Sequence, residues 1–192
     1  GSEMCIRDRA VCENGNYYNR FYFVHPDGAV QHYDKKHLFT FGGEHKRFTA
    51  GTERVVVNFR GVRILLEVCY DLRFPVWSRN LGDYDMILYV ASWPTPRVDA
   101  WSALLRARAI ENQCYVAGVN RMGVDPACEY SGGSAIIDPY GKTIAECPWS
   151  RESAVSADID MEALQAFRKK FPVLDDADPF TCLLYTSPSP RD

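Results

Sequence analysis

The chain has 192 residues, of which 46 % are hydrophobic and 24 % charged, and its formal net charge is −3. This length supports one domain with a sizeable core, and the scattered basic residues give no sign of a nucleic-acid-binding face. No apolar run approaches the roughly 20 residues that a membrane helix needs, so we expect no membrane partner.

The amino-terminal half is predicted to consist of β-strands. A Pro-Asp-Gly turn at 26–28 separates one pair of strands, and Arg60-Gly61 separates a second pair. The strand predicted over 62–69 is almost entirely apolar, which is typical of a central strand covered on both faces. A loop is expected over 36–51. The predicted strands are 19–25, 29–33, 55–59 and 62–69.

The carboxyl-terminal half mixes strands with helices. Apolar residues recur at helical spacing over 100–112, and a second helix over 161–171 should stop at Pro172. The predicted strands are 86–91, 114–119, 135–141 running into a turn, 142–147 and 154–159. Such a mixture indicates an α/β layered domain.

The two ends of the chain are related through DNA. One duplex encodes residues 182–192 on one strand and residues 1–8 on the other, and it resembles a transposase-type sequencing adapter. We therefore expect residues 1–9 and 182–192 to derive from untrimmed adapter, which leaves residues 10–181 as the native domain. Coincidence is the alternative explanation.

The seven cysteines are far apart and form no Cys-x-x-Cys pair, which argues against zinc and redox motifs. Free cysteines suit a reducing compartment, so we expect a cytoplasmic protein. Cys69 stands out because a buried strand ends there and a polar turn begins. At such a junction a nucleophile can be exposed on a rigid scaffold, although a cysteine so placed is more often part of a core.

The surroundings of Cys69 favour catalysis. The segment Tyr-Asp-Lys-Lys-His-Leu-Phe at 33–39 precedes Glu44, and Cys-Tyr-Asp-Leu-Arg-Phe-Pro follows at 69–75. These segments resemble the lysine and cysteine motifs of the nitrilase superfamily of carbon-nitrogen hydrolases, and the resemblance spans nearly all of residues 19–180. It implies an α-β-β-α sandwich, here truncated at the amino end.

The resemblance assigns catalytic roles residue by residue. It implies that Cys69 is the nucleophile, that Lys35 is the catalytic lysine and that Glu44 is the loop glutamate, whereas Lys36 fills a variable position. The general-base glutamate of the family lies well upstream, and none of the acids before Tyr33 matches it. No residue is assigned to that role.

Within the superfamily the motifs are most similar to those of bacterial omega-amidases, which cleave the terminal amide of 2-oxo acid amides such as 2-oxoglutaramate. A carboxylate substrate needs a cation, and Arg73 is a candidate, with an ion pair to Asp71 or a neighbour as its structural alternative. Arg97 is a second candidate. Tyr70 is expected to donate its backbone N–H to the oxyanion, and Trp93 either walls the pocket or belongs to the core.

Two other functions stay open. The protein could be an amidase or carbamoylase of different specificity, or a catalytically silent member of the fold that acts as a binding subunit. The resemblance implies a small-molecule amide as partner, a homodimer at full length, and no metal or organic cofactor. The four histidines do not cluster as metal ligands do.

Overall fold

The computed structural model describes residues 5–178 of the chain. The strands are β1 (Cys5–Glu13), β2 (Asn16–Val24), β3 (Val30–Asp34), β4 (Val56–Phe59), β5 (Val62–Val68), β6 (Met86–Ala91), β7 (Tyr115–Asn120), β8 (Met122–Val124), β9 (Glu129–Ser131), β10 (Ala135–Ile137) and β11 (Thr143–Glu146). The α-helices are α1 (Val98–Glu111) and α2 (Met161–Lys170). The 3₁₀ turns are η1 (Thr40–Gly42), η2 (Glu44–Lys46), η3 (Cys69–Arg73), η4 (Thr95–Arg97) and η5 (Val173–Asp176).

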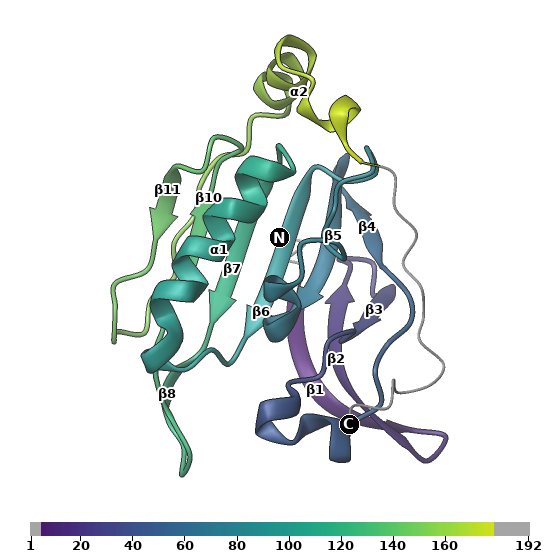
Figure 1. The fold of residues 1–192 in the computed structure, drawn as a ribbon, viewed down its shortest axis with the longest axis vertical. Coiled ribbons are helices and arrows are strands. Elements are labelled where there is room, and N and C mark those ends of the chain that lie inside the picture. Colours follow the sequence, from purple (N-terminus) through teal and green to yellow (C-terminus); the bar gives the residue numbers. More distant parts are fainter. Residues whose placement is uncertain (1–4, 179–192) are drawn as a thin grey trace, which may run out of the picture.

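Nine of the described strands form two stacked sheets, and β8 and β9 pair as a separate hairpin. The larger sheet has the order β11-β10-β7-β6-β5-β4, and its centre, β5, β6 and β7, is parallel. The smaller sheet has the order β1-β2-β3 and is antiparallel. Helix α1 lies across the front of the larger sheet in Figure 1. The described residues therefore show helix, sheet and sheet as successive layers, and the predicted α/β class is confirmed.

Successive side chains of β5 point to opposite faces of the sheet and contribute to two hydrophobic cores. Leu65 points into the cluster under α1, where it joins Trp101 and Leu105. Leu66 points into the cluster between the two sheets, where it joins Phe21. Because successive residues of a strand face opposite sides, one apolar strand can serve two cores. The strand predicted to be covered on both faces is therefore confirmed.

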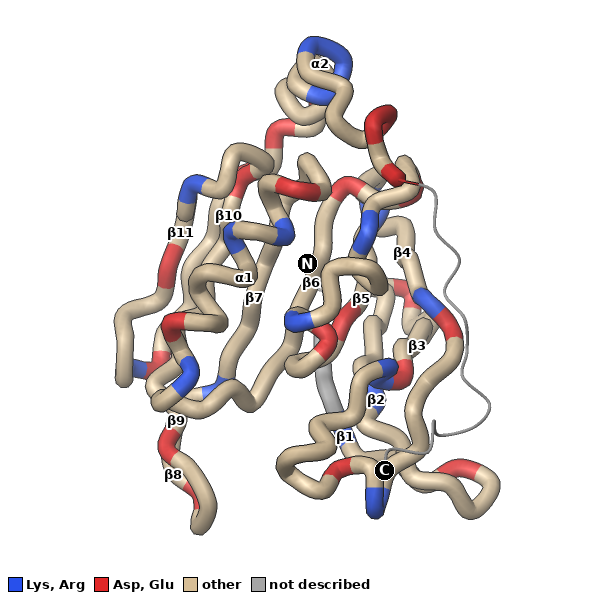
Figure 2. Tube along the Cα trace, in the orientation of Figure 1, with Lys and Arg blue, Asp and Glu red and all other residues tan. Residues whose placement is uncertain are grey.

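Helix α2 sits at the end of the larger sheet opposite the one where β5 and β6 terminate. Arg168 donates to the backbone carbonyl oxygen of Gln113 and to the carboxylate of Asp85, which lie at the starts of β7 and β6. The side chain of Asp160 accepts from the backbone N–H of Ala163 and caps the helix. Figure 2 shows acidic and basic residues interspersed over the part of the chain that it describes.

Most predicted elements are confirmed to within a few residues, and two expectations differ. Residues 154–159 have no regular structure, so the strand predicted there is wrong. Alternating apolar residues supply one face, but a strand also needs a hydrogen-bonding neighbour, and no described strand pairs with this segment. The short hairpin of β8 and β9 was not predicted, because its strands have three residues each.

The structure describes part of the predicted adapter segment at the amino end and none of the one at the carboxyl end. Strand β1 begins at Cys5, so it includes residues 5–9, for which the sequence indicates an adapter origin. Its backbone pairs continuously with β2 from Glu13 opposite Asn16 to Cys5 opposite Val24. Residues 1–4 and 179–192 lie outside the described residues. No described helix has the length and apolar character needed to cross a membrane.

Candidate active site

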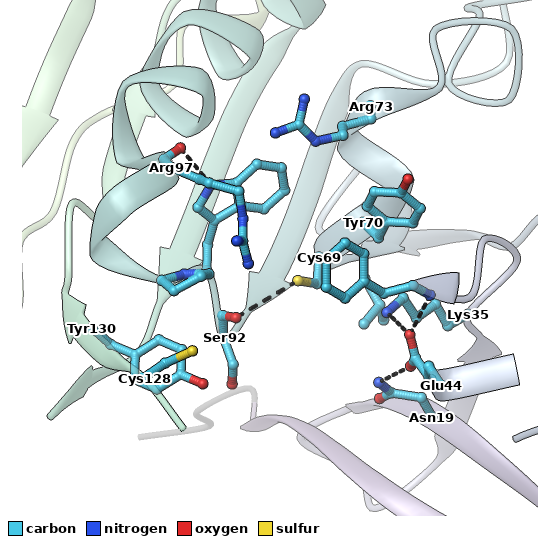
Figure 3. A pocket seen from close by; sticks show the side chains of 14 residues that line it. Asn19, Lys35, Glu44, Cys69, Tyr70, Arg73, Ser92, Arg97, Cys128 and Tyr130 are labelled. Atoms are coloured by element: carbon cyan, nitrogen blue, oxygen red, sulfur yellow. Dashed lines mark hydrogen bonds and ion pairs between the residues drawn. The ribbon is translucent and has the colours of Figure 1, made fainter. Parts of the chain in front are cut away.

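A cavity of ≈ 280 Å³ opens where the parallel strands β5 and β6 end (Figure 3). The carboxyl ends of parallel strands are the usual place for ligands in α/β sheets, and this volume suits a small molecule rather than a polymer. The cavity is lined by Asn19, Lys35, Phe39, Glu44, Val68, Cys69, Tyr70, Arg73, Ser92, Trp93, Pro94, Arg97, Cys128 and Tyr130. Every site residue that the sequence indicated is in this set.

Cys69 lies at the junction between β5 and the turn η3. Its φ of 48° is in the left-handed region, which a non-glycine residue adopts at a cost of about 1–3 kcal/mol. The conformation turns the chain sharply as the strand ends. Its thiol approaches the carbonyl oxygen of Ser92 at 4.0 Å and lines the cavity (Figure 3). Such strain is typical of functional positions.

Lys35 and Glu44 form a buried ion pair beside the thiol. The Nζ of Lys35 lies 2.7 Å from Oε2 of Glu44, and their side chains are only 4 % and 13 % exposed. Glu44 also accepts from the backbone N–H of Phe39 and from the amide of Asn19. The carboxylate thus fixes the lysine amine in one place. Lys36 instead places its amine over the ring of Trp77, 5.3 Å from the centroid.

The ionisation of the two reactive groups differs. Burial raises the pKa of the Cys69 thiol, and the positive charge of Lys35 offsets this only in part. Burial also acts to raise the pKa of Glu44, but the charge of Lys35 and the hydrogen bonds from Lys35, Phe39 and Asn19 together outweigh it, and the pKa is lowered. At neutral pH the thiol is therefore protonated while Glu44 is a carboxylate. Among the described lining residues, Glu44 is the one carboxyl group, and its oxygens are already engaged.

A second buried acid lies on β5, two residues before Cys69 and the nucleophile turn η3. Glu67 is fully buried and accepts a hydrogen bond of 2.9 Å from the Ser78 hydroxyl. Burial, together with the negative charge of Asp71, raises the pKa of Glu67 to about 8. The folded state thus retains a proton that the unfolded chain loses at pH ~4.3. The corresponding stability is complete below that pH and is lost as pH rises to about 8.

Replacing Glu67 by glutamine should therefore flatten the pH dependence of thermal stability. We expect the melting temperature of the Glu67→Gln variant at pH 8 to exceed that of the parent by roughly a few degrees, with a smaller difference at pH 5. Thermal melts followed by circular dichroism across this pH range would measure it. Glu146→Gln, at an exposed position of β11, is the control and should keep the parent slope. Equal slopes in all three proteins would contradict the prediction.

Two arginines line the cavity without a carboxylate partner among the described residues. The Arg73 guanidinium lies over the ring of Trp93, 5.1 Å from the centroid, and that of Arg97 lies over Phe39 at 5.4 Å. Asp71 pairs with other groups, so the structural ion pair considered for Arg73 is not present. Both cations are available to an anionic ligand (Figure 3).

The structure also settles the location of Trp93 and adds residues that the sequence did not single out. Trp93 is 3 % exposed, belongs to the core under α1 and also lines the cavity. Asn19 and Ser92 contact the site through hydrogen bonds, and Cys128 and Tyr130 come from the β9 hairpin. Ser92 carried a signal in the sequence, because it adjoins Trp93. Within residues 5–178, no three His, Cys, Asp or Glu side chains gather as a metal site.

Comparisons with known proteins identify the family of the chain. Residues 4–169 match the Carbon-nitrogen hydrolase family. The chain is 55 % identical over 163 residues to the omega-amidase YafV of Escherichia coli strain K12, a match covering 84 % of this chain and 64 % of that protein. It is 41 % identical over 170 residues to the 2-oxoglutaramate amidase of Bacillus subtilis strain 168, covering 87 % and 65 %.

A solved structure from the same superfamily has a similar fold. The CN-hydrolase superfamily protein XC1258 of Xanthomonas campestris is 44 % identical and superposes with a TM-score of 0.91, covering 94 % of this chain and 71 % of that chain. The chain spans less than two thirds of the length of the two amidases. Its motifs, fold and relatives agree, and the chain belongs to the carbon-nitrogen hydrolase family of the nitrilase superfamily.

Proposed function

We propose that this chain is the greater part of an amidase that hydrolyses the terminal amide of 2-oxo acid amides such as 2-oxoglutaramate and releases ammonia. One observation carries the proposal: the Cys69 thiol and the Lys35–Glu44 ion pair line the same small cavity. A thiol alone would fit a core cysteine, and an ion pair alone would fit a structural contact. Together, in a cavity of this size, they fit acyl transfer.

The proposed reaction has two steps. A base takes the proton from the Cys69 sulfur, and the thiolate attacks the amide carbon to give a tetrahedral oxyanion. The Lys35 ammonium and the backbone N–H of Tyr70 stabilise this oxyanion, and such preorganised donors contribute roughly 3–4 kcal/mol each. The base returns the proton to the leaving nitrogen, and ammonia departs. Water then attacks the thioester, and the acid product and the free thiol result.

The base comes from outside the described residues in this proposal. Glu44 is unsuited to the role, because Lys35, Asn19 and Phe39 hold its carboxylate and its pKa is lowered. A glutamate further upstream in a longer protein would supply it. We also propose that residues 1–9 and 182–192 derive from sequencing adapter, and that the native domain in this chain is 10–181.

The proposed substrate carries a carboxylate, and the arginines of the cavity give a reason. The Lys35–Glu44 pair is neutral overall, whereas Arg73 and Arg97 bring two positive charges without described acidic partners. An anionic group opposite Cys69 would be attracted to them. A guanidinium binds a carboxylate through two parallel hydrogen bonds, which a lysine cannot reproduce. A relative named as a 2-oxoglutaramate amidase supports the same class of substrate.

Substituting Arg73 by lysine should separate acidic from neutral substrates. In a chain extended at the amino end to the length of its relatives, we expect KM for 2-oxoglutaramate to rise about 10-fold, because one charged hydrogen bond is lost. KM for pentanamide, which has the same chain length and no carboxylate, should stay within about 2-fold. The measurement is ammonia release as a function of substrate concentration.

Arg106→Lys is the matched control, since Arg106 lies on the exposed side of α1 and contacts Thr143. It should leave both Michaelis constants unchanged. An equal rise for the two amides in Arg73→Lys would show that Arg73 has a structural role only. If Arg97→Lys alone discriminated the substrates, Arg97 would be the carboxylate-binding residue. A parent enzyme without preference for the acidic amide would refute the proposed substrate class.

We propose, finally, that the whole protein is a cytoplasmic homodimer. Its compartment is supported by the five free cysteines among the described residues, which persist as thiols in reducing surroundings. The dimer is proposed from the family resemblance. Sedimentation analysis of the extended chain would test it.

A further inference from the structure

Asp71 is a fully buried carboxylate two residues after Cys69, and it accepts four hydrogen bonds. One comes from the Tyr33 hydroxyl at 2.8 Å, and one comes from the backbone N–H of Val68 at 3.1 Å. The other two come from His37, through its backbone N–H and its Nδ1, each at 2.8 Å. A carboxylate offers about four lone-pair positions, so this one is saturated.

The donors belong to the two segments that carry the reactive groups. Tyr33 and His37 flank Lys35, two residues away on either side. Val68 directly precedes Cys69. These two segments are more than 30 residues apart in sequence, and the Asp71 carboxylate joins them through three hydrogen bonds on one side and one on the other.

The surrounding rings restrict this junction further. The imidazole of His37 stacks on Phe74 with a centroid distance of 3.8 Å and an interplanar angle of 6°. The indole of Trp77 donates to the Tyr33 hydroxyl at 3.1 Å. Both aromatic residues follow η3 in the sequence. The chain that begins at the nucleophile turn therefore contacts the lysine segment on both sides of Lys35. Rotation of either donor away from Asp71 would break packed contacts.

The Cys69 backbone depends on the same carboxylate. A positive φ at a non-glycine residue persists only where its surroundings over-determine it. The Asp71 carboxylate accepts from the backbone N–H of Val68, the residue before Cys69. The backbone carbonyl oxygen of Asp71 accepts from the N–H of Phe74 at the end of the turn. The carboxylate therefore ties the strained turn at its start and anchors it to the lysine segment.

We propose that Asp71 is a positioning residue that sets the placement of the Lys35 amine relative to the Cys69 thiol. It contacts neither substrate nor the reacting atoms, and it acts through Tyr33, His37 and the nucleophile turn. This inference rests on the proposed function, which makes the lysine and the cysteine partners in one reaction.

Asp71→Asn tests the inference, because an amide nitrogen in place of one oxygen cannot accept these bonds. The first measurement is the rate at which iodoacetamide alkylates Cys69 in the 192-residue chain across neutral and alkaline pH, followed by mass spectrometry of the Cys69 peptide. The positive charge of Lys35 lowers the pKa of the thiol and the negative charge of Asp71 raises it. If Asp71 positions Lys35, its loss moves the alkylation midpoint to higher pH. If it acts only through its own charge, the midpoint moves to lower pH.

The second measurement is turnover of 2-oxoglutaramate in the extended chain. We expect kcat of Asp71→Asn to fall about 100-fold with KM within about 2-fold, since small displacements of catalytic groups have effects of this size. Tyr33→Phe removes one of the four donors and should give a smaller loss in the same direction. The double variant should be no worse than Asp71→Asn alone, because both act through one contact.

Asp85→Asn is the control, since Asp85 is also buried and ion-paired, with Arg63 and Arg168, at the other end of the sheet. It should lower the melting temperature and leave the alkylation midpoint and kcat unchanged. If Asp71→Asn behaved in the same way, Asp71 would be structural only and the inference would fall. If Asp71→Asn did not fold, an unchanged midpoint in Tyr33→Phe would overturn the inference. An upward shift in the midpoint without amide turnover by the parent enzyme would refute the proposed function and keep the positioning role.

Discussion

Replacing Cys69 by alanine should lower the rate of ammonia release from 2-oxoglutaramate by about 10⁶-fold in the extended chain, the scale seen when a catalytic nucleophile is removed. The physical reason is that the sulfur forms the bond to the amide carbon, and Cys128, the other described cysteine that lines the cavity, lies before β9 and not at the end of β5. The fold should persist, because the side chain is small and lines a cavity. Thermal melting would verify this.

Two other cysteines provide matched controls. Cys128 lines the same cavity, and Cys114 is buried under α1, where burial raises the pKa of its thiol strongly. Both Cys128→Ala and Cys114→Ala should retain most of the activity. The nucleophile assignment would be wrong if either variant were inactive while Cys69→Ala turned over substrate.

The 192-residue chain by itself should release ammonia at least about 10³-fold more slowly than the chain extended at its amino end. The Cys69 thiol is protonated at neutral pH because burial raises its pKa, and the carboxyl group nearest to it in the cavity is held by Lys35. Members of a catalytic unit act together, so the lack of the base removes most of the rate. Parallel assays of the two proteins at equal concentration would measure the difference.

The same comparison has a structural readout. In the described residues, β3 and β1 are the edges of the smaller sheet, and open edges favour association between chains. We expect the extended chain to give a larger monodisperse fraction on size exclusion. A variant of the extended chain with its proposed upstream glutamate replaced by glutamine separates the two effects: it should be monodisperse and inactive. Comparable turnover by the short and extended chains would refute the need for an upstream base.

Local patterns were sufficient for the elements whose signal lies within a short stretch of chain. The apolar run ending at Cys69 predicted a covered strand, helical spacing predicted α1, and Pro172 marked the predicted end of α2. The pattern failed at 154–159, because alternation cannot reveal whether a neighbouring strand is present. It also missed β8 and β9, which have too few residues to show a period.

The sequence by itself determined which residues are candidates for the site. Lys35, Glu44 and Cys69 were indicated by motif, and so was the choice of Lys35 over Lys36. Residue type and order are properties of the chain, so a motif can carry them. Distances, burial and charge partners arise only when segments far apart in the chain pack together.

The tertiary structure decided the rest for that physical reason. It placed Asn19 against Glu44 and engaged both oxygens of that carboxylate, which argues against Glu44 as the base. It paired Asp71 with Tyr33 and His37, across more than 30 residues of sequence, and so left Arg73 over Trp93 without an acidic partner among the described residues. The motif contains the aspartate and the arginine two residues apart, but only packing determines which side chains each one contacts.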